Sequence, residues 1–177
     1  MKRLMILTLA VGSMAVVSMP VALVAATPAA QAAAATAKPD FTGSWKLDLG
    51  KSVYGPVPSP NAETNVITQT GDDFKLVTTQ EGGTGTLTYT INFTAGAPES
   101  QVPKDAFPAN SDLTILTTKG DWSGAVLVIV QKASYQGMAV AISQRFTLSD
   151  DGKELTKITN YSTDQGDFDT KTVYEKL

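Results

Sequence analysis

The chain has 177 residues, a net charge of −3, and neither histidine nor cysteine. Without these two residue types it cannot build a Ser-His-Asp or Cys-His catalytic centre, a typical zinc site or a disulfide. No basic cluster and no phosphate-binding glycine motif is present, which disfavours nucleic acid and nucleotide cofactors as partners. We therefore expect no cofactor, no metal ion and no nucleic-acid partner.

The first segment has the pattern of a secretory signal peptide. A basic start precedes a mostly apolar run over residues 4–17, which is short for a membrane span. Two A-x-A sites follow, so we expect a signal peptide over 1–32 with cleavage after Ala32 or Ala37, and a flexible linker over 33–40. The sequence thus predicts a secreted or periplasmic protein without a stable membrane anchor after cleavage. A retained anchor is the alternative.

Beyond residue 40, short runs of alternating apolar and polar residues are separated by turn residues. We find no helical periodicity longer than about two turns. The predicted strands span residues 41–49, 63–70, 74–80, 86–94, 112–118, 125–132, 138–149, 154–161 and 168–176. Their connections are compatible with antiparallel neighbours.

A meander of this length avoids unpaired edges best by closing on itself. We therefore predict an all-β fold, a single antiparallel up-and-down β-barrel of about 8–10 strands over residues 41–177. A β-sandwich is the alternative. Two segments interrupt the pattern: the proline-rich stretch Tyr54–Pro60, which cannot be helical, and the long loop Ala95–Ser111, whose role the sequence leaves open.

Both ends of this domain resemble the calycin superfamily. Phe41-Thr-Gly-Ser-Trp-Lys-Leu resembles the first strand of lipocalins, with their G-x-W, and of fatty-acid-binding proteins, and Val173-Tyr-Glu-Lys resembles the last strand of the latter. The stretch GSWKLDLGKSVYGPVPSP, residues 43–60, and the hairpin LSDDGKELT, residues 148–156, are similar to an exported bacterial family of lipocalin-like proteins. These motifs are structural, so the resemblance implies a lipocalin-like barrel more than an activity.

The chain departs from the fatty-acid-binding proteins in two places. Those proteins hold a carboxylate with an Arg-x-Tyr on the last strand, and the matching positions here are Thr172-Val173-Tyr174, which keep the tyrosine and lack the cation. They also carry a helical lid after the first strand, where this chain has residues 54–60. The resemblance therefore puts in doubt that a fatty acid is held in the same way.

Three residues are candidates for closing one end of the barrel. The G-x-W pattern favours Trp45, with Gly43, as a core plug over a ligand contact. Arg145 is the candidate for a cation that covers the indole ring, as in lipocalins, which the chain resembles. Strand parity instead places Arg145 on the outer face, so both placements stay open.

Six residues form the candidate ligand-binding set. Their side chains share the parity of the large apolar residues on their strands, which places them toward the lumen: Tyr89, Phe93, Met138, Thr170, Thr172 and Tyr174. The hydroxyl groups could orient a ligand in a mostly apolar pocket. The alternative is a hydroxyl network that is satisfied internally or by buried water.

These patterns predict an exported, non-catalytic protein that binds a small apolar or amphipathic, lipid-like molecule inside a β-barrel. The alternative is a filled barrel that serves as a cell-envelope interaction or structural module without a ligand. Ala125–Val130 is apolar on both faces, and its outer stripe of Val126, Val128 and Val130 motivates a homodimer or partner surface. Carboxylate-pair hydrolysis would need two inward carboxylates close together.

Overall fold

The computed structural model describes residues 37–83, 85–108 and 111–177. The predicted signal peptide lies outside the described residues. So do the first A-x-A site, the first two residues of the second, and residues 33–36 of the predicted linker. No helix in the described part of the chain is long and apolar enough to cross a membrane.

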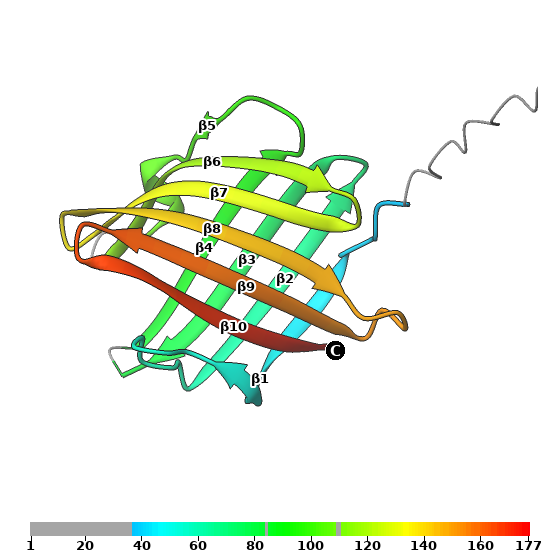
Figure 1. Ribbon diagram of the computed structural model, residues 1–177, viewed down its shortest axis with the longest axis horizontal. Helices are drawn as coiled ribbons and strands as arrows, with labels where there is room; N and C mark the ends of the chain where they lie inside the picture. The colour runs from blue at the N-terminus through cyan, green and yellow to red at the C-terminus, as the bar shows by residue number, and fades with distance from the viewer. Residues whose placement is uncertain (1–36, 84, 109–110) are drawn as a thin grey trace, which may run out of the picture. The chain divides into compact units, whose positions relative to one another are not determined.

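Ten antiparallel strands form one continuous sheet (Figure 1). In chain order they are β1 (Gly43–Val53), β2 (Ala62–Thr70), β3 (Asp73–Gly82), β4 (Gly85–Thr94), β5 (Ser100–Gln101), β6 (Leu113–Ser123), β7 (Val126–Tyr135), β8 (Met138–Leu148), β9 (Glu154–Thr163) and β10 (Gly166–Lys176). A short 3-10 turn, η1 (Lys104–Ala106), follows β5. Strand β1 pairs with both β2 and β10, so the sheet order runs from β4 through β1 to β10 and on to β5.

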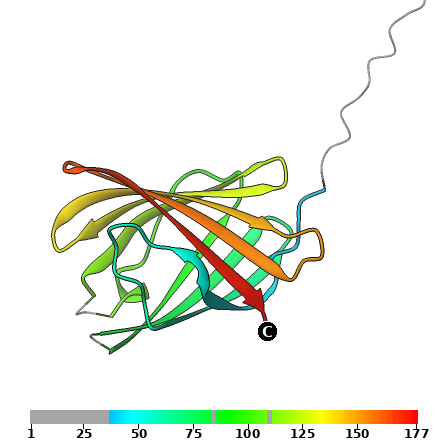
Figure 2. The ribbon, with the colours of Figure 1, turned by 60° about the horizontal axis from the view of Figure 1, so that its bottom comes forward.

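Alternating residues explain how the sheet acquires an inside and an outside. In the β3–β4 ladder, Phe74 lies opposite Phe93, Leu76 opposite Ile91 and Thr78 opposite Tyr89, and these pairs face inward. The sheet curves so that β1–β4 lie across from β6–β10 (Figures 1 and 2). Apolar side chains from both halves therefore share one core.

The barrel is nearly closed at the seam between β4 and β6. A single bridge joins Ala95 to Gly120 there, and the Gly96 N–H donates a hydrogen bond to the Gly120 carbonyl at 2.9 Å. The Phe93 ring lies directly against Gly120, where any Cβ atom would overlap it. Glycine at position 120 therefore permits the closest approach of the two strands.

These observations confirm the predicted all-β barrel, and every predicted strand is present. The tenth strand, β5, lies inside the long loop Ala95–Ser111 and pairs with β6 over two residues. The prediction ended the fifth strand at Thr118, whereas β6 continues to Ser123. Gly120 and Asp121 are typical turn residues, but here they stay paired with Ile129 and Val128 of β7, and the Phe93 ring occupies the space beside Gly120.

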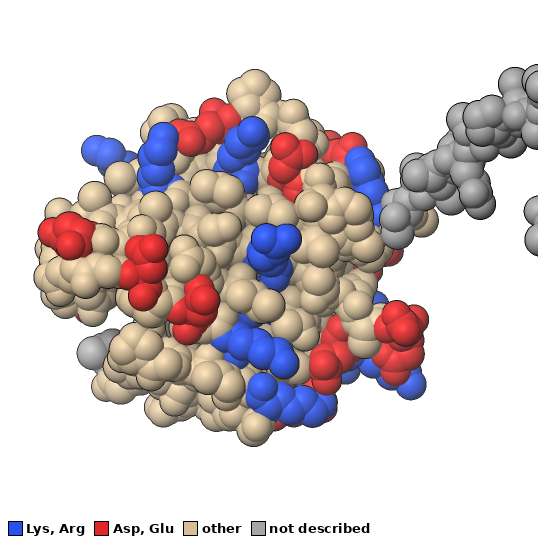
Figure 3. All heavy atoms as spheres, in the orientation of Figure 1, with Lys and Arg blue, Asp and Glu red and all other residues tan. Residues whose placement is uncertain are grey.

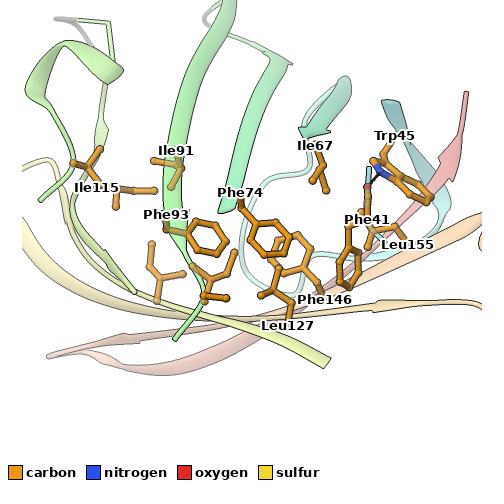
Figure 4. Packing of buried hydrophobic residues seen from close by; sticks show 14 of the residues in the cluster. Phe41, Trp45, Ile67, Phe74, Ile91, Phe93, Ile115, Leu127, Phe146 and Leu155 are labelled. Atoms are coloured by element: carbon orange, nitrogen blue, oxygen red, sulfur yellow. Dashed lines mark hydrogen bonds between the residues drawn. The ribbon is translucent and has the colours of Figure 1, made fainter. Parts of the chain in front are cut away.

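One half of the barrel is filled with aromatic side chains (Figure 4). Phe74 stacks on Phe93 with ring centroids 5.0 Å apart, and Phe41 stacks on Trp122 at 6.0 Å and meets Phe146 edge-on at 6.4 Å. Each fully buried large apolar side chain contributes about 1.5–3 kcal/mol to folding. This half supplies much of the core, and the polar side chains of the interior gather in the other half.

Acidic and basic side chains are interspersed on the outer face of β6–β10 (Figure 3). In this face Val128 lies between Asp121 on β6 and Arg145 on β8, and Val130 lies between Lys119 and Ser143. Val130 is 48% exposed. The apolar stripe is therefore one strand wide and is flanked by charged groups, and a homodimer through it stays a prediction.

Candidate functional site

The polar half of the barrel contains a cavity of about 310 Å³. Its apolar wall is formed by Leu87, Leu113, Ile115 and Ile142, and its polar wall by Glu63, Gln80, Gln131, Gln144 and Lys157, with Tyr89 and Tyr161 contributing to both. These residues come from β2, β3, β4, β6, β7, β8 and β9. Such a mixed wall suits an amphipathic molecule.

A larger and more open groove of about 470 Å³ lies along the seam between β4 and β6. Phe74 and Phe93 contribute to it, together with Lys75, Lys119 and several threonines. Ligand sites usually bury most of the ligand surface, so we take the internal cavity as the candidate site.

A buried ion pair lies in the cavity wall. The Lys157 Nζ is 3.2 Å from the Glu63 Oε1, and the two side chains are 14% and 8% exposed. Tyr174 donates its hydroxyl hydrogen to the same oxygen at 2.6 Å, and the Asn65 amide donates to it at 3.0 Å. Thr78 in turn donates to Asn65 at 2.6 Å. The carboxylate is thus held from β2, β9 and β10.

Both members of this pair are charged at neutral pH. Burial opposes ionisation of Glu63, but the positive charge of Lys157 and the hydrogen bonds from Tyr174 and Asn65 outweigh it, so the pKa of Glu63 lies below its usual value. Burial likewise opposes the charge on Lys157, and the carboxylate of Glu63 outweighs this, so the pKa of Lys157 lies well above its usual value.

Several buried polar atoms of the described residues have no hydrogen-bond partner there. They are the Gln131 Oε1, the Tyr54 Oη and the Oγ1 atoms of Thr117 and Thr118. Gln131 is 3% exposed and lines the cavity. Burial raises the pKa of Tyr54 to about 12, which keeps its hydroxyl protonated. Unpaired buried groups are costly unless water or a ligand satisfies them.

The structure brings two of the predicted ligand residues to this cavity or its ion pair. Tyr89 lines the cavity and stacks on Phe107 of the long loop, with ring centroids 4.9 Å apart. Tyr174 is fully buried and reaches the cavity through its hydrogen bond to Glu63. Thr170 and Thr172 are buried on β10, but they do not line the cavity, and Thr172 donates to the Lys157 carbonyl at 3.3 Å.

The two remaining predicted residues lie elsewhere. Phe93 is buried in the aromatic half of the barrel, where it stacks on Phe74. Met138 lies on the inward-facing side of β8. It is nevertheless 42% exposed, because it lies at the hairpin between β7 and β8, beyond the end of the lumen. Parity alone does not give the height of a residue along the barrel, so it does not distinguish these two positions from those that line the cavity.

Trp45 is completely buried, and its Nε1 donates to the Phe41 carbonyl at 2.9 Å. The cation over its ring is Lys176, with Nζ 5.2 Å from the ring centroid. The predicted cap, Arg145, is instead exposed on the outer face, as its strand parity indicates. Gly43 has φ +150°, a backbone conformation that residues with a side chain rarely adopt, which explains the glycine of the G-x-W motif.

Sequence reasoning missed the ion pair that dominates the site. Glu63 shares its strand face with Asn65 and Ile67, and Lys157 shares its face with Leu155 and Tyr161. A single charged residue on an otherwise inward face of each strand was the available signal. Pairing the two required the fold, because 94 positions separate them in the chain.

In the part of the chain that the structure describes, no group of three or more His, Cys, Asp or Glu is placed to hold a metal ion. The fold and the cavity together define the class: a ten-stranded antiparallel β-barrel, filled at one end and hollow at the other.

Comparison with known proteins supports this fold assignment. A solved structure of zebrafish ileal bile acid-binding protein in complex with cholic acid matches with a TM-score of 0.52 and 20% identity, over 77% of this chain and 98% of that chain. No protein-family description and no curated protein sequence matches. At this identity the likeness concerns the fold.

Proposed function

We propose that this chain is an exported, non-catalytic binding protein that holds one small amphipathic molecule inside its barrel. The observation that carries the proposal is the internal cavity of about 310 Å³, whose wall combines aliphatic side chains with buried amide, ammonium and carboxylate groups. A cavity of this size falls at the lower end of ligand pockets, which range from roughly 300 to 1,000 Å³.

The fold also supports the proposed binding function. The zebrafish protein of similar fold was crystallised with cholic acid, an amphipathic molecule. The unpaired Gln131 Oε1 in the cavity of this chain offers a hydrogen-bond acceptor to an amphipathic ligand that carries a hydroxyl, amide or amine group. Together these features favour a binding role over a filled barrel without a ligand.

The proposal that the protein is not an enzyme follows from the groups at the site. The sequence has neither histidine nor cysteine. The buried carboxylate of the cavity, Glu63, is engaged with Lys157, Tyr174 and Asn65, and the other carboxylate of the wall, Asp112, is exposed. This arrangement does not provide the acid–base pair that glycoside hydrolysis requires.

A cavity-blocking variant tests the proposal. Gln144 on β8 lines the cavity, whereas the adjacent Ser143 points to the outer face between Val130 and Asn160. With the uncharged fluorescent probe N-phenylnaphthylamine, we expect saturable binding to the wild type, loss of binding with Gln144→Trp, and unchanged binding with Ser143→Trp. The absence of binding to the wild type, or equal binding by both variants, would contradict a ligand site in this cavity.

A further inference from the structure

The cation of the cavity already has a carboxylate partner supplied by the protein. Lys157 is the basic residue of the cavity wall, and Glu63 meets it at 3.2 Å. The carboxylate is fixed by hydrogen bonds from Tyr174 and Asn65, so it cannot swing away to admit another anion without leaving buried partners unpaired.

The charged side chains that line the cavity add up to a small net negative charge, so they attract neither a cation nor an anion strongly. The wall holds two carboxylates, Glu63 and Asp112, and one ammonium group, Lys157. A ligand carboxylate placed near Lys157 would also be placed near Glu63, and like charges close together in a desolvated site repel strongly.

One buried atom in the cavity wall needs a hydrogen-bond donor from a ligand. The Gln131 Oε1 is a buried acceptor without a partner in the described part of the chain, and Gln131 lines the cavity. A hydroxyl, amide or amine group of a ligand could donate to it, whereas a carboxylate could not.

We propose that Glu63 acts as an internal counter-anion to Lys157, and that the cavity thereby selects uncharged amphipathic ligands with a hydrogen-bond donor and excludes carboxylates and other anions. This inference rests on the proposed function, and it assigns to Glu63 the role of a specificity-determining residue. It also explains how the barrel keeps a buried cation, Lys157, beside the Tyr174 ring without using it to hold an acid.

Two probes that differ by a single sulfonate group test the inference. N-phenylnaphthylamine is uncharged, and anilinonaphthalene sulfonate carries the same rings with a negative charge. We expect the wild type to bind the uncharged probe about tenfold or more tightly than the anionic one. Signal that survives Gln144→Trp arises outside the cavity and is subtracted.

Glu63→Gln should release Lys157 for an external anion, so that the preference for the uncharged probe falls about tenfold. The double variant Glu63→Gln with Lys157→Gln should not bind the anionic probe better than the wild type does. Glu81→Gln removes the same charge from an exposed position of β3 and should leave the preference unchanged.

The outcomes separate the two proposals. If the wild type binds both probes equally well in the cavity, or if Glu63→Gln folds and keeps the wild-type preference, the role of Glu63 is wrong while the binding function stands. If neither probe enters the cavity, the proposed function itself fails. Circular dichroism reports whether Glu63→Gln folds, and if it does not, the wild-type preference alone decides.

Discussion

At the scale of single residues, the Glu63 carboxylate connects parts of the chain that are distant in sequence. It receives Tyr174 from β10, Lys157 from β9 and Asn65 from its own strand, β2. Removing one partner of such a buried pair leaves the other charge unpaired in a poorly solvated place. The network is therefore both part of the cavity wall and a structural connection across the barrel.

Tyr174→Phe tests this connection. The variant keeps the ring in the core but removes the 2.6 Å hydrogen bond to Glu63, and we expect a loss of about 1.5–3 kcal/mol in the free energy of unfolding, because the acceptor is charged. Urea denaturation measures the loss. Tyr135→Phe, at a side chain that is 43% exposed, should change stability by less than about 0.5 kcal/mol.

The pH dependence of stability follows from the lowered pKa of Glu63. Its ordinary value is 4.5, and the folded-state pKa lies lower, so its contribution to stability is fully present above pH 4.5 and is lost as the pH falls through the folded-state pKa. Lys157 has a raised pKa, so its contribution is present below pH 10.5 and is lost as the pH rises through the folded-state pKa.

Glu63→Gln isolates this contribution. At pH 7 we expect the variant to lose about 3–5 kcal/mol, because it leaves Lys157 without its partner. The difference between wild type and variant should shrink as the pH falls below 4.5. Urea unfolding across the acid range measures this difference. A gap that stays constant down to the acid unfolding of the wild type would show that Glu63 is not preferentially ionised in the folded state.

At the scale of elements, the seam between β4 and β6 is closed by an isolated bridge between Ala95 and Gly120 instead of a continuous ladder. Gly120→Ala would place a methyl group in the space of the Phe93 ring. We expect a loss of about 1–3 kcal/mol, measured by urea denaturation, because overpacked cores shift the backbone. Gly82→Ala is the control, since a Cβ there meets no atom within 4 Å. Equal effects at both positions would contradict the account of the seam.

The sequence was sufficient to predict the strands, their antiparallel order and the burial of Trp45, because alternation and turn residues are local signals. It did not predict β5, which has only two residues, or the continuation of β6 through Gly120 and Asp121, which are typical turn residues but pair with β7 here. Strand parity puts Tyr89 and Tyr174 on the inner face of the barrel, but it gives no height along the barrel for Phe93 and Met138. The Glu63–Lys157 pair depends on contacts between β2 and β9, which no local pattern reports.

At the scale of the whole molecule, the interior of the barrel has two halves with different roles. The aromatic half around Phe41, Phe74 and Phe146 supplies apolar burial. The other half keeps a cavity with a charged and hydrogen-bonding wall. This division reconciles the two interpretations of the sequence, a filled barrel and a hollow one, because each describes one end of the same barrel.

Export is a prediction at this scale as well. Intact-mass measurement of the protein recovered from the producing cells should give a chain that begins at Ala33 or Lys38, according to which A-x-A site is cleaved. Recovery of the complete chain from the cytoplasm would contradict export. The binding proposal would be unaffected by that result.

The central claim is that the cavity holds a small molecule, and native mass spectrometry of the protein purified from the cells that produce it tests this most directly. We predict a species heavier than the polypeptide by one small uncharged molecule, which is released when the protein is denatured and is absent from Gln144→Trp. A spectrum of the bare polypeptide alone, or an adduct that Gln144→Trp retains, would contradict the account.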